Sequence, residues 1–337
     1  RPDLAQKAAN MTQEELAGLL YESLYNKILP LPDDVTVYPA HGAGSACGKN
    51  MMKETVDSLG NQKKLNYALN QPNKEAFIKA VTDGLLPPPG YFGMNVAMNK
   101  KGYDSFDTVL LHGMRALNVN AFEAAAESAG ALILDTRSDK EFANGFIPQS
   151  INIGLKGDFA PWVGALIVNV QQPILLVAET GKEEEAVTRL SRVGFDNVLG
   201  HLAGGFEAWK KAGKEIDSVN RISPEQFALQ LGSKHTSDGK LGDSIIIDVR
   251  KESEFAAEHI KDAYSKPLAY ISDWIKDVNP QEHFFLHCAG GYRSMIAASI
   301  LQARGYRNFT EVAGGFNAIA KTNVPRTEFV CQSKASH

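Results

Sequence analysis

The sequence predicts an α/β protein in which two copies of one domain, each built on a parallel β-sheet, follow a separate N-terminal segment. Residues 132–137 resemble residues 245–250, and a Glu-Phe pair follows both at the same interval of 113 residues. A second match, Ala-Gly-Gly-Phe, occurs at 203–206 and at 313–316. A repeat of this size indicates duplicated domains, because solenoid repeats run to only about 20–50 residues. Each copy also alternates short apolar runs with helical stretches, which is typical of an α/β sheet.

The N-terminal segment, residues 1–103, belongs to neither copy. Its expected elements are a helix over 12–29 with a capping box at Thr12 and Glu15, a strand over 35–38 and a helix over 74–83. The segment is short and has few strands. We therefore expect that it does not bury a full core by itself.

The two copies are expected to span residues 104–217 and 218–337. Apolar runs predict strands in the first copy at 131–135, 173–178 and 197–200, with a helix at 183–192. In the second copy they predict strands at 244–249, 283–287 and 308–312, with helices at 223–231 and 293–304. Continuously apolar strands are typical of parallel sheets that are covered on both faces. Ligands of such sheets bind beyond the carboxyl ends of the strands.

Composition limits the classes of partner. Apolar residues make up 44% of the chain, charged residues 22%, and the net charge is −4. This balance is ordinary for a globular protein and predicts neither a nucleic-acid partner nor a membrane partner. Three scattered cysteines, Cys47, Cys288 and Cys331, do not form a disulfide framework, so we expect a reducing, cytoplasmic compartment.

The chemistry of the sequence centres on Cys288, which follows an apolar strand and precedes a helix. Gly290 and Gly291 let the backbone curl so that successive amides point inward and form a nest for an anion. The helix N-terminus and Arg293 add positive charge, which should favour the thiolate. Such a thiolate can attack the outer sulfur of thiosulfate or of a persulfide and carry it as a cysteine persulfide. The alternative is a buried structural cysteine, a common fate of free cysteine.

These motifs resemble the rhodanese family over both copies, about two thirds of the chain. The matching residues are 248–250, 254–255, 259–260, 288–294 and 313–316. The resemblance implies that Cys288 forms the persulfide, and Cys288 and Arg293 are the expected catalytic residues. It also implies that the surrounding loop binds the substrate anion, through Ala289, Gly290, Gly291, Tyr292, Arg293 and Ser294. Asp248 and Arg250, at the end of a strand, are expected to give structural support, with Arg250 paired to Glu254.

The first copy is expected to be catalytically inactive, as in family members that place an inactive copy before an active one. No cysteine occurs in residues 115–216, and glutamates crowd the turn that corresponds to the Cys288 loop. These carboxylates suit a helix N-terminus but would repel thiosulfate. The expected roles of this copy are packing and shaping the pocket of the second copy.

Two other functions compete with sulfur transfer. Cysteine-dependent phosphatases place five residues between their Cys and Arg, whereas four lie between Cys288 and Arg293. We expect this shorter loop to suit sulfur and exclude phosphate. The second alternative is a non-catalytic rhodanese module with a binding or regulatory role, because a fold alone does not decide function.

The N-terminal segment resembles the C-terminal part of metallo-β-lactamase-fold proteins, in the branch of persulfide dioxygenases and glyoxalase II. The matching residues are 1–4 and 38–45. The His-x-His-x-Asp-His metal motif of that fold is absent from this sequence, which we expect to begin inside the domain. His41 matches the family's last histidine and would serve as a metal ligand only in a complete domain. The resemblance implies no cofactor in this chain, and iron or zinc in a complete parent protein.

The parent protein would be a persulfide dioxygenase or, alternatively, a metallohydrolase such as a thioesterase. The expected partners of the present chain are small sulfur compounds, namely thiosulfate and low-molecular-weight persulfides. A homo-oligomer is also expected, because a broken lactamase edge could drive association.

Overall fold

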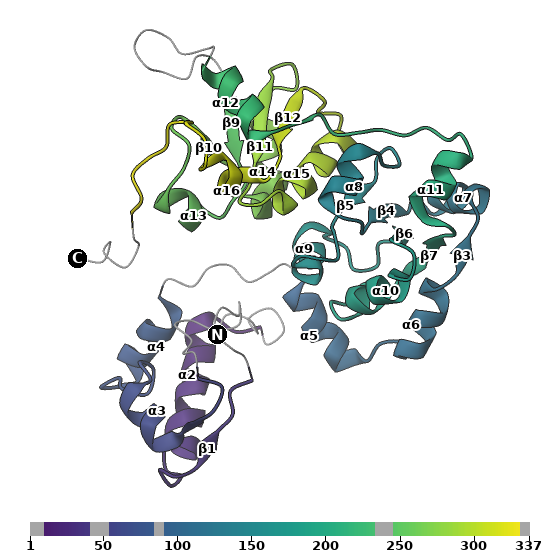
Figure 1. Cartoon of the computed structure of the whole chain (residues 1–337). Coiled ribbons are helices and arrows are strands. Elements are labelled where there is room, and N and C mark those ends of the chain that lie inside the picture. Colours follow the sequence, from purple (N-terminus) through teal and green to yellow (C-terminus); the bar gives the residue numbers. More distant parts are fainter. Residues whose placement is uncertain (1–9, 41–53, 84–90, 233–244, 331–337) are drawn as a thin grey trace. The chain divides into compact units, whose positions relative to one another are not determined.

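The computed structural model describes residues 10–40, 54–83, 91–232 and 245–330. The chain divides into two compact units, Arg1–Tyr103 and Asp104–His337 (Figure 1). Among the described residues, no helix combines the length and the apolar character needed to cross a bilayer.

The first unit is mainly helical. Its elements are α2 (Gln13–Ser23), η2 (Leu24–Ile28), β1 (Thr36–Val37), β2 (Asp57–Ser58), α3 (Leu59–Leu65), α4 (Lys74–Thr82) and α5 (Phe92–Lys101). The predicted capping box is present, since the Glu15 amide donates to Thr12 Oγ1 and the Thr12 amide donates to the Glu15 carboxylate. The predicted long helix is shorter as an α-helix, because it continues as the π-helical turn η2. The described core of this unit is a small cluster around Ala17, Phe77 and Val81.

The second unit contains two five-stranded sheets whose strand pairs are all parallel. In the first copy the strand order is β3 (Ala116–Leu117), β7 (Val198–Leu202), β6 (Ile174–Val177), β4 (Leu132–Asp135), β5 (Ile151–Asn152). In the second copy the corresponding order is β8 (Arg221–Ile222), β12 (Phe309–Val312), β11 (Phe284–His287), β9 (Ile245–Asp248), β10 (Tyr264–Ser265). The two sheets have the same topology, so the predicted duplication and the parallel α/β fold are confirmed.

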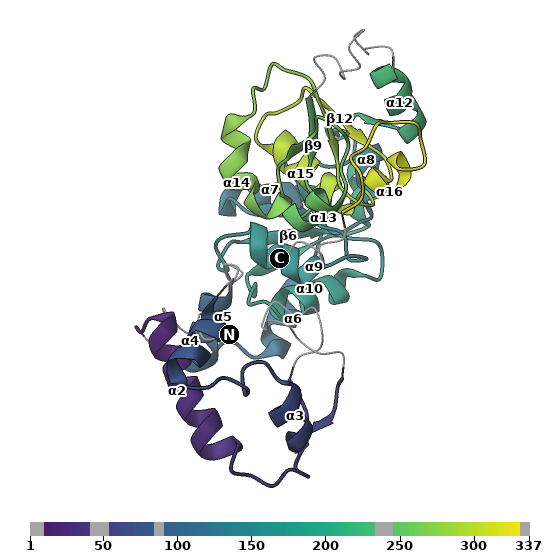
Figure 2. The ribbon, with the colours of Figure 1, turned by 90° about the vertical axis from the view of Figure 1, so that its left-hand side faces the viewer.

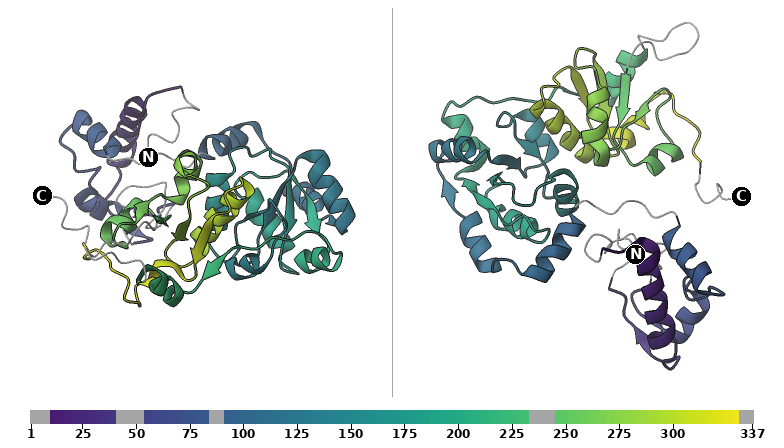
Figure 3. Two further views of the ribbon diagram at one scale, coloured as in Figure 1. Left: turned by 90° about the horizontal axis from the view of Figure 1, so that it is seen from above. Right: turned by 180° about the vertical axis from the view of Figure 1, so that it is seen from behind.

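Helices flank both sheets, as Figures 2 and 3 show for each copy. The first copy carries α6 (Phe106–Gly113), α7 (Val119–Ala129), α8 (Asp139–Asn144), α9 (Phe159–Leu166), α10 (Glu183–Ser191) and α11 (Gly205–Lys211). The second copy carries α12 (Pro224–Gly232), α13 (Glu252–Ala257), η3 (Leu268–Tyr270), α14 (Ile271–Trp274), η4 (Ile275–Asp277), α15 (Tyr292–Ala303) and α16 (Gly315–Ile319). Both copies place a non-glycine residue in the left-handed region at the same turn, Gln149 with φ 65° and Asp262 with φ 63°. This shared and uncommon backbone conformation extends the duplication to the geometry of single turns.

The helix α15 joins the two copies. Nine consecutive residues, from Ser294 to Gln302, are buried along it. One of its faces covers the sheet of the second copy and another contacts β5 of the first copy (Figure 1). The Asn152 amide of β5 donates to Ser299 Oγ at 3.0 Å. A helix buried on all sides needs apolar or paired residues around its whole circumference. The residues of α15 therefore have to suit the sheet of the second copy on one face and β5 of the first copy on another.

Candidate active site at Cys288

Cys288 lies directly beyond β11, the central strand of the second sheet, and α15 begins four residues later. All four residues of β11 are buried. The position at the carboxyl end of a central parallel strand is where α/β sheets bind ligands. The fold therefore carries the Cys288 side chain to the end of the sheet at which chemistry is expected.

Two polar groups of its own loop and helix contact the sulfur. The Gly291 amide donates to Cys288 Sγ at 3.2 Å, and Ser294 Oγ lies 3.4 Å from the same sulfur. Gly291 has φ 104°, which favours glycine and turns its amide inward. These contacts would also stabilise a sulfur anion. Cys288 is only 1% exposed, so the thiol lies beneath the surface in this conformation.

The loop is held from below by the helix α16. The amide of Phe316 donates to the carbonyl of Cys288 at 2.6 Å, and the amide of Asn317 donates to the carbonyl of Ala289 at 2.9 Å. Gly315 permits this approach, because a Cβ atom there would collide with the Cys288 carbonyl oxygen. The repeated Ala-Gly-Gly-Phe motif thus serves to dock a short helix onto the loop. Gly290 has open space around it.

The Arg293 guanidinium binds Glu254. Its two terminal nitrogens lie 2.6 and 2.8 Å from the two carboxylate oxygens. The hydrogen bonds from Arg293 lower the pKa of Glu254, and the same pairing raises the pKa of Arg293. Much of the positive charge next to the loop is therefore balanced by a carboxylate on α13.

Asp248 and Arg250 form a buried pair under the site. The Arg250 Nε lies 2.8 Å from Asp248 Oδ2, and its Nη2 donates to the Glu258 carbonyl at 2.8 Å. The predicted pairing of Arg250 with Glu254 is wrong. Arg250 folds back on the carboxylate two residues before it, and Glu254 faces the first turn of α15 instead. The stacking of the Arg250 guanidinium on the Phe316 ring, 4.0 Å from its centroid, links this pair to α16.

Tyr292 leaves the loop and contacts the first copy. Its hydroxyl donates to the Gly154 carbonyl at 2.8 Å, and its ring packs so closely on Gly157 that a Cβ atom there would collide with it. Burial raises the pKa of Tyr292 well above its ordinary value. Tyr292 therefore fastens the loop to the neighbouring copy.

A buried charged network that the sequence analysis missed lies behind the thiol. Ser294 Oγ donates to Glu311 Oε1 at 2.6 Å, and Arg221 Nε lies 2.7 Å from Glu311 Oε2. Arg221 Nη2 donates to Asp139 of the first copy at 2.8 Å. One signal was available in the sequence: Glu311 is a carboxylate inside a predicted strand of a sheet covered on both faces, where a buried carboxylate must find a partner.

The first copy has an altered version of the same site. Ala178 follows β6 in the position that Cys288 has after β11. The Gly181 amide, which corresponds to that of Gly291, donates at 2.7 Å to the Glu183 carboxylate. A cavity of about 400 Å³ lies there, and its lining includes Arg137, Ala178 and Glu179. The Glu183 carboxylate thus accepts the hydrogen bond that the Gly181 amide would otherwise be free to donate to a bound anion.

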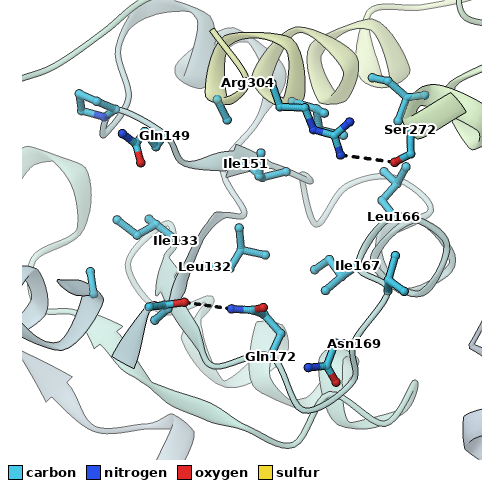
Figure 4. A pocket seen from close by; sticks show the side chains of 18 of the residues that line it. Leu132, Ile133, Gln149, Ile151, Leu166, Ile167, Asn169, Gln172, Ser272 and Arg304 are labelled. Carbon is cyan, nitrogen blue, oxygen red and sulfur yellow. Dashed lines mark hydrogen bonds between the residues drawn. The ribbon is translucent and has the colours of Figure 1, made fainter. Parts of the chain in front are cut away.

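A second cavity, of about 670 Å³, lies between the first copy and the C-terminal half of α15 (Figure 4). It is lined mainly by apolar side chains, among them Leu132, Ile151 and Leu166. At its rim Arg304 donates to Ser272 Oγ at 3.3 Å. Leu132 begins β4, so this cavity lies near the amino end of that strand and away from the thiol.

The remaining predicted ligands lie elsewhere. His41, Cys47 and Cys331 fall outside the described residues. Within the described ranges, no group of three or more His, Cys, Asp or Glu side chains is arranged to hold a metal ion.

Comparison with known proteins shows which domain family both copies match. The family model of the rhodanese-like domain matches residues 118–212 and 226–322. A sulfurtransferase of Allochromatium vinosum is 26% identical over 107 residues, which are 32% of this chain and 94% of that protein. The thiosulfate sulfurtransferase GlpE of Pseudomonas putida is 31% identical over 101 residues, which are 30% of this chain and 84% of that protein.

Among solved structures, a metallo-β-lactamase from Staphylococcus aureus is 27% identical, with a TM-score of 0.47. The match covers 57% of this chain and 51% of that chain, so the present chain spans about half the length of that protein. The two matches to the family model cover more than half of the present chain. The chain therefore belongs to the rhodanese-like domain family and carries two such domains in tandem.

Proposed function

We propose that this chain is a sulfurtransferase that moves sulfane sulfur from thiosulfate or a low-molecular-weight persulfide to a thiol or cyanide through Cys288. The observation that carries the proposal is the donation of the Gly291 amide to Cys288 Sγ at the end of the central strand. The names of the two sulfurtransferase relatives support it. We assign the activity to residues 218–337 and an inactive, supporting role to residues 104–217.

The reaction has two steps. The Cys288 thiolate attacks the outer sulfur of thiosulfate, a sulfur–sulfur bond forms to Cys288, and sulfite leaves with the electron pair of the broken bond. The terminal sulfur of the persulfide is then attacked by the acceptor, and the Cys288 thiolate is released. The Gly291 amide and the Ser294 hydroxyl stabilise the sulfur anion in both steps.

The experiment is to treat the purified chain with thiosulfate and measure its intact mass. We expect one added sulfur atom, released as thiocyanate by cyanide. C288S should show neither, whereas C47S and C331S, which remove the other two cysteines, should behave as the wild type. Added sulfur that persists in C288S would contradict the assignment.

A non-catalytic module is the second candidate, and the burial of Cys288 at 1% exposure favours it. A donor must displace neighbouring side chains before it reaches the sulfur. The same mass measurement separates the two functions, because a binding module would take up no labile sulfur. The phosphatase alternative predicts turnover of an aryl phosphate that C288S abolishes, and we expect no such turnover.

For the complete parent protein we propose a persulfide dioxygenase that is coupled to this sulfurtransferase in the cytoplasm. The support is the resemblance of residues 1–4 and 38–45 to the C-terminal part of a metallo-β-lactamase-like domain. His41 would serve as a metal ligand only in a complete domain of that kind. Stoichiometric iron in a longer protein, and none in this chain, is the expected result. Zinc with thioesterase activity would instead support the metallohydrolase.

A further inference from the structure

Glu311 is a carboxylate in an unusual place. It lies in β12 with 0% exposure, between the buried residues Thr310 and Val312. Carboxylates are almost never fully buried unless they are paired. Burial raises the pKa of Glu311 above its ordinary value, although Arg221 and Ser294 oppose this effect. The group is therefore a better proton acceptor than an exposed glutamate.

Two contacts connect this carboxylate to the thiol. Ser294 Oγ lies 3.4 Å from Cys288 Sγ and 2.6 Å from Glu311 Oε1. A serine hydroxyl has one proton to donate and two lone pairs that accept. It can therefore accept from the Cys288 thiol while it donates to Glu311. This arrangement is a continuous path for a proton from sulfur to carboxylate.

The first copy contributes to the same path. Arg221 Nε lies 2.7 Å from Glu311 Oε2, but its N–H is not aimed at that oxygen, so the contact is an ion pair without an aligned hydrogen bond. The same guanidinium donates through Nη2 to Asp139 of α8. Asp139 thus shares the positive charge of Arg221. Without it, Arg221 would hold Glu311 more firmly in its ionised form.

The other charged groups near the thiol have partners of their own. Arg293 is bound by Glu254, and Asp248 by Arg250. His287 is buried, which lowers its pKa, and its Nδ1 lies 3.2 Å from the Cys288 carbonyl oxygen. Across the described residues, Ser294 is the side chain whose polar atom contacts Sγ. The path to Glu311 is therefore the direct exit for the thiol proton.

We propose that Glu311 accepts the Cys288 proton through Ser294 when sulfur is loaded, and that Arg221 and Asp139 position it for this role. The inference rests on the sulfurtransferase function proposed above. The thiol proton passes to Ser294 as the hydroxyl proton passes to Glu311. The resulting thiolate attacks the outer sulfur of thiosulfate, and sulfite departs. When the acceptor removes the sulfur, Glu311 returns the proton to the Cys288 thiolate by the same route.

The first test compares E311Q with the wild type in the rate of persulfide formation with thiosulfate across a range of pH. General acid–base groups typically contribute roughly 10²- to 10⁴-fold, so we expect a fall of about 10²-fold at neutral pH. The rate should recover at alkaline pH, where solvent removes the proton. E282Q, which changes an exposed glutamate of the same copy, should match the wild type.

A purely structural Glu311 predicts the opposite sign. Removing a negative charge beside the thiol would then favour the thiolate and leave the rate unchanged or higher, which would overturn the proposal. If E311Q does not fold, judged by thermal unfolding, the pair S294A and S294T replaces it. S294A should show the same slowing with alkaline recovery, and S294T, which keeps the hydroxyl, should restore the rate. A wild-type rate in S294A would also overturn the proposal.

D139N tests the part played by the first copy. We expect slower loading at neutral pH with the same alkaline recovery. Its control is E252Q, which changes the exposed residue at the corresponding position of the second copy. Equal rates of sulfur loading in D139N and E252Q would show that Asp139 has no part in positioning Glu311. A wild-type chain that takes up no sulfur would refute the proposed function itself, whereas a loading wild type with an unaffected E311Q would refute the proton path alone.

Discussion

At the scale of single residues, a glycine allows the helix α16 to approach the Cys288 loop closely. Gly315 has φ 56°, and a Cβ atom there would collide with the Cys288 carbonyl oxygen, which accepts a hydrogen bond from Phe316. Gly305 in the same copy has φ 86° and open space around it. Both glycines have a positive φ, at which any other residue is strained, but they differ in their surroundings, so they separate backbone strain from collision.

We therefore expect G315A to be more destabilising than G305A. Backbone strain at such positions costs on the order of 1–3 kcal/mol, and only G315A adds the collision and shifts the loop. Urea unfolding measures the stability difference, and thiosulfate loading measures the loop. Equal losses in both variants would show that the loop tolerates the extra methyl group.

At the scale of elements, α15 carries both the loop and the contact between the copies. The buried Asn152 amide of β5 has Ser299 Oγ as its hydrogen-bond acceptor, and Ser299 Oγ in turn donates to the Ile296 carbonyl at 2.7 Å. Both copies pack against this helix. Removing the Ser299 hydroxyl is therefore expected to weaken the packing of both copies on it.

S299A should destabilise the protein by about 1–3 kcal/mol, the usual cost of a buried amide without a partner. S272A is the control, because Ser272 is exposed and accepts from Arg304 at the rim of the large cavity. Thermal unfolding of both variants gives the comparison. A shift no larger for S299A than for S272A would mean that the amide finds another acceptor.

At the scale of the whole molecule, the two copies have corresponding loops in which the same amide has different hydrogen-bond acceptors. In the second copy the Gly291 amide faces a thiol, and in the first the Gly181 amide faces the Glu183 carboxylate. Restoring a cysteine alone should therefore not restore chemistry. We expect A178C to take up one sulfur atom in total, on Cys288, and A178C/C288S to take up none. Intact-mass measurement after thiosulfate treatment decides this, and a second added sulfur would show that the first copy needs only its nucleophile.

The sequence by itself determined the duplication, the parallel sheets and the place of Cys288 between a strand and a helix. These features follow from patterns within short stretches: apolar runs, capping residues and glycines at turns. The boundaries of β9, β11, β12 and α15 lie within one residue of those predicted. The helix predicted over 12–29 corresponds to α2 followed directly by η2, and the sequence did not predict the change to a π-helical turn, which has no clear local signal.

Only the tertiary structure decided which side chains meet around the thiol. Arg293 binds Glu254, Tyr292 reaches Gly154, and Arg221 joins Glu311 to Asp139. These partners are 39, 138 and up to 90 residues apart, and no local pattern encodes their meeting. Buried charges must find partners wherever the packing of strands and helices brings them together. The partners of Arg293 and Glu311 therefore follow from the fold of the second copy, and Gly154 and Asp139 become partners only because the first copy packs against it.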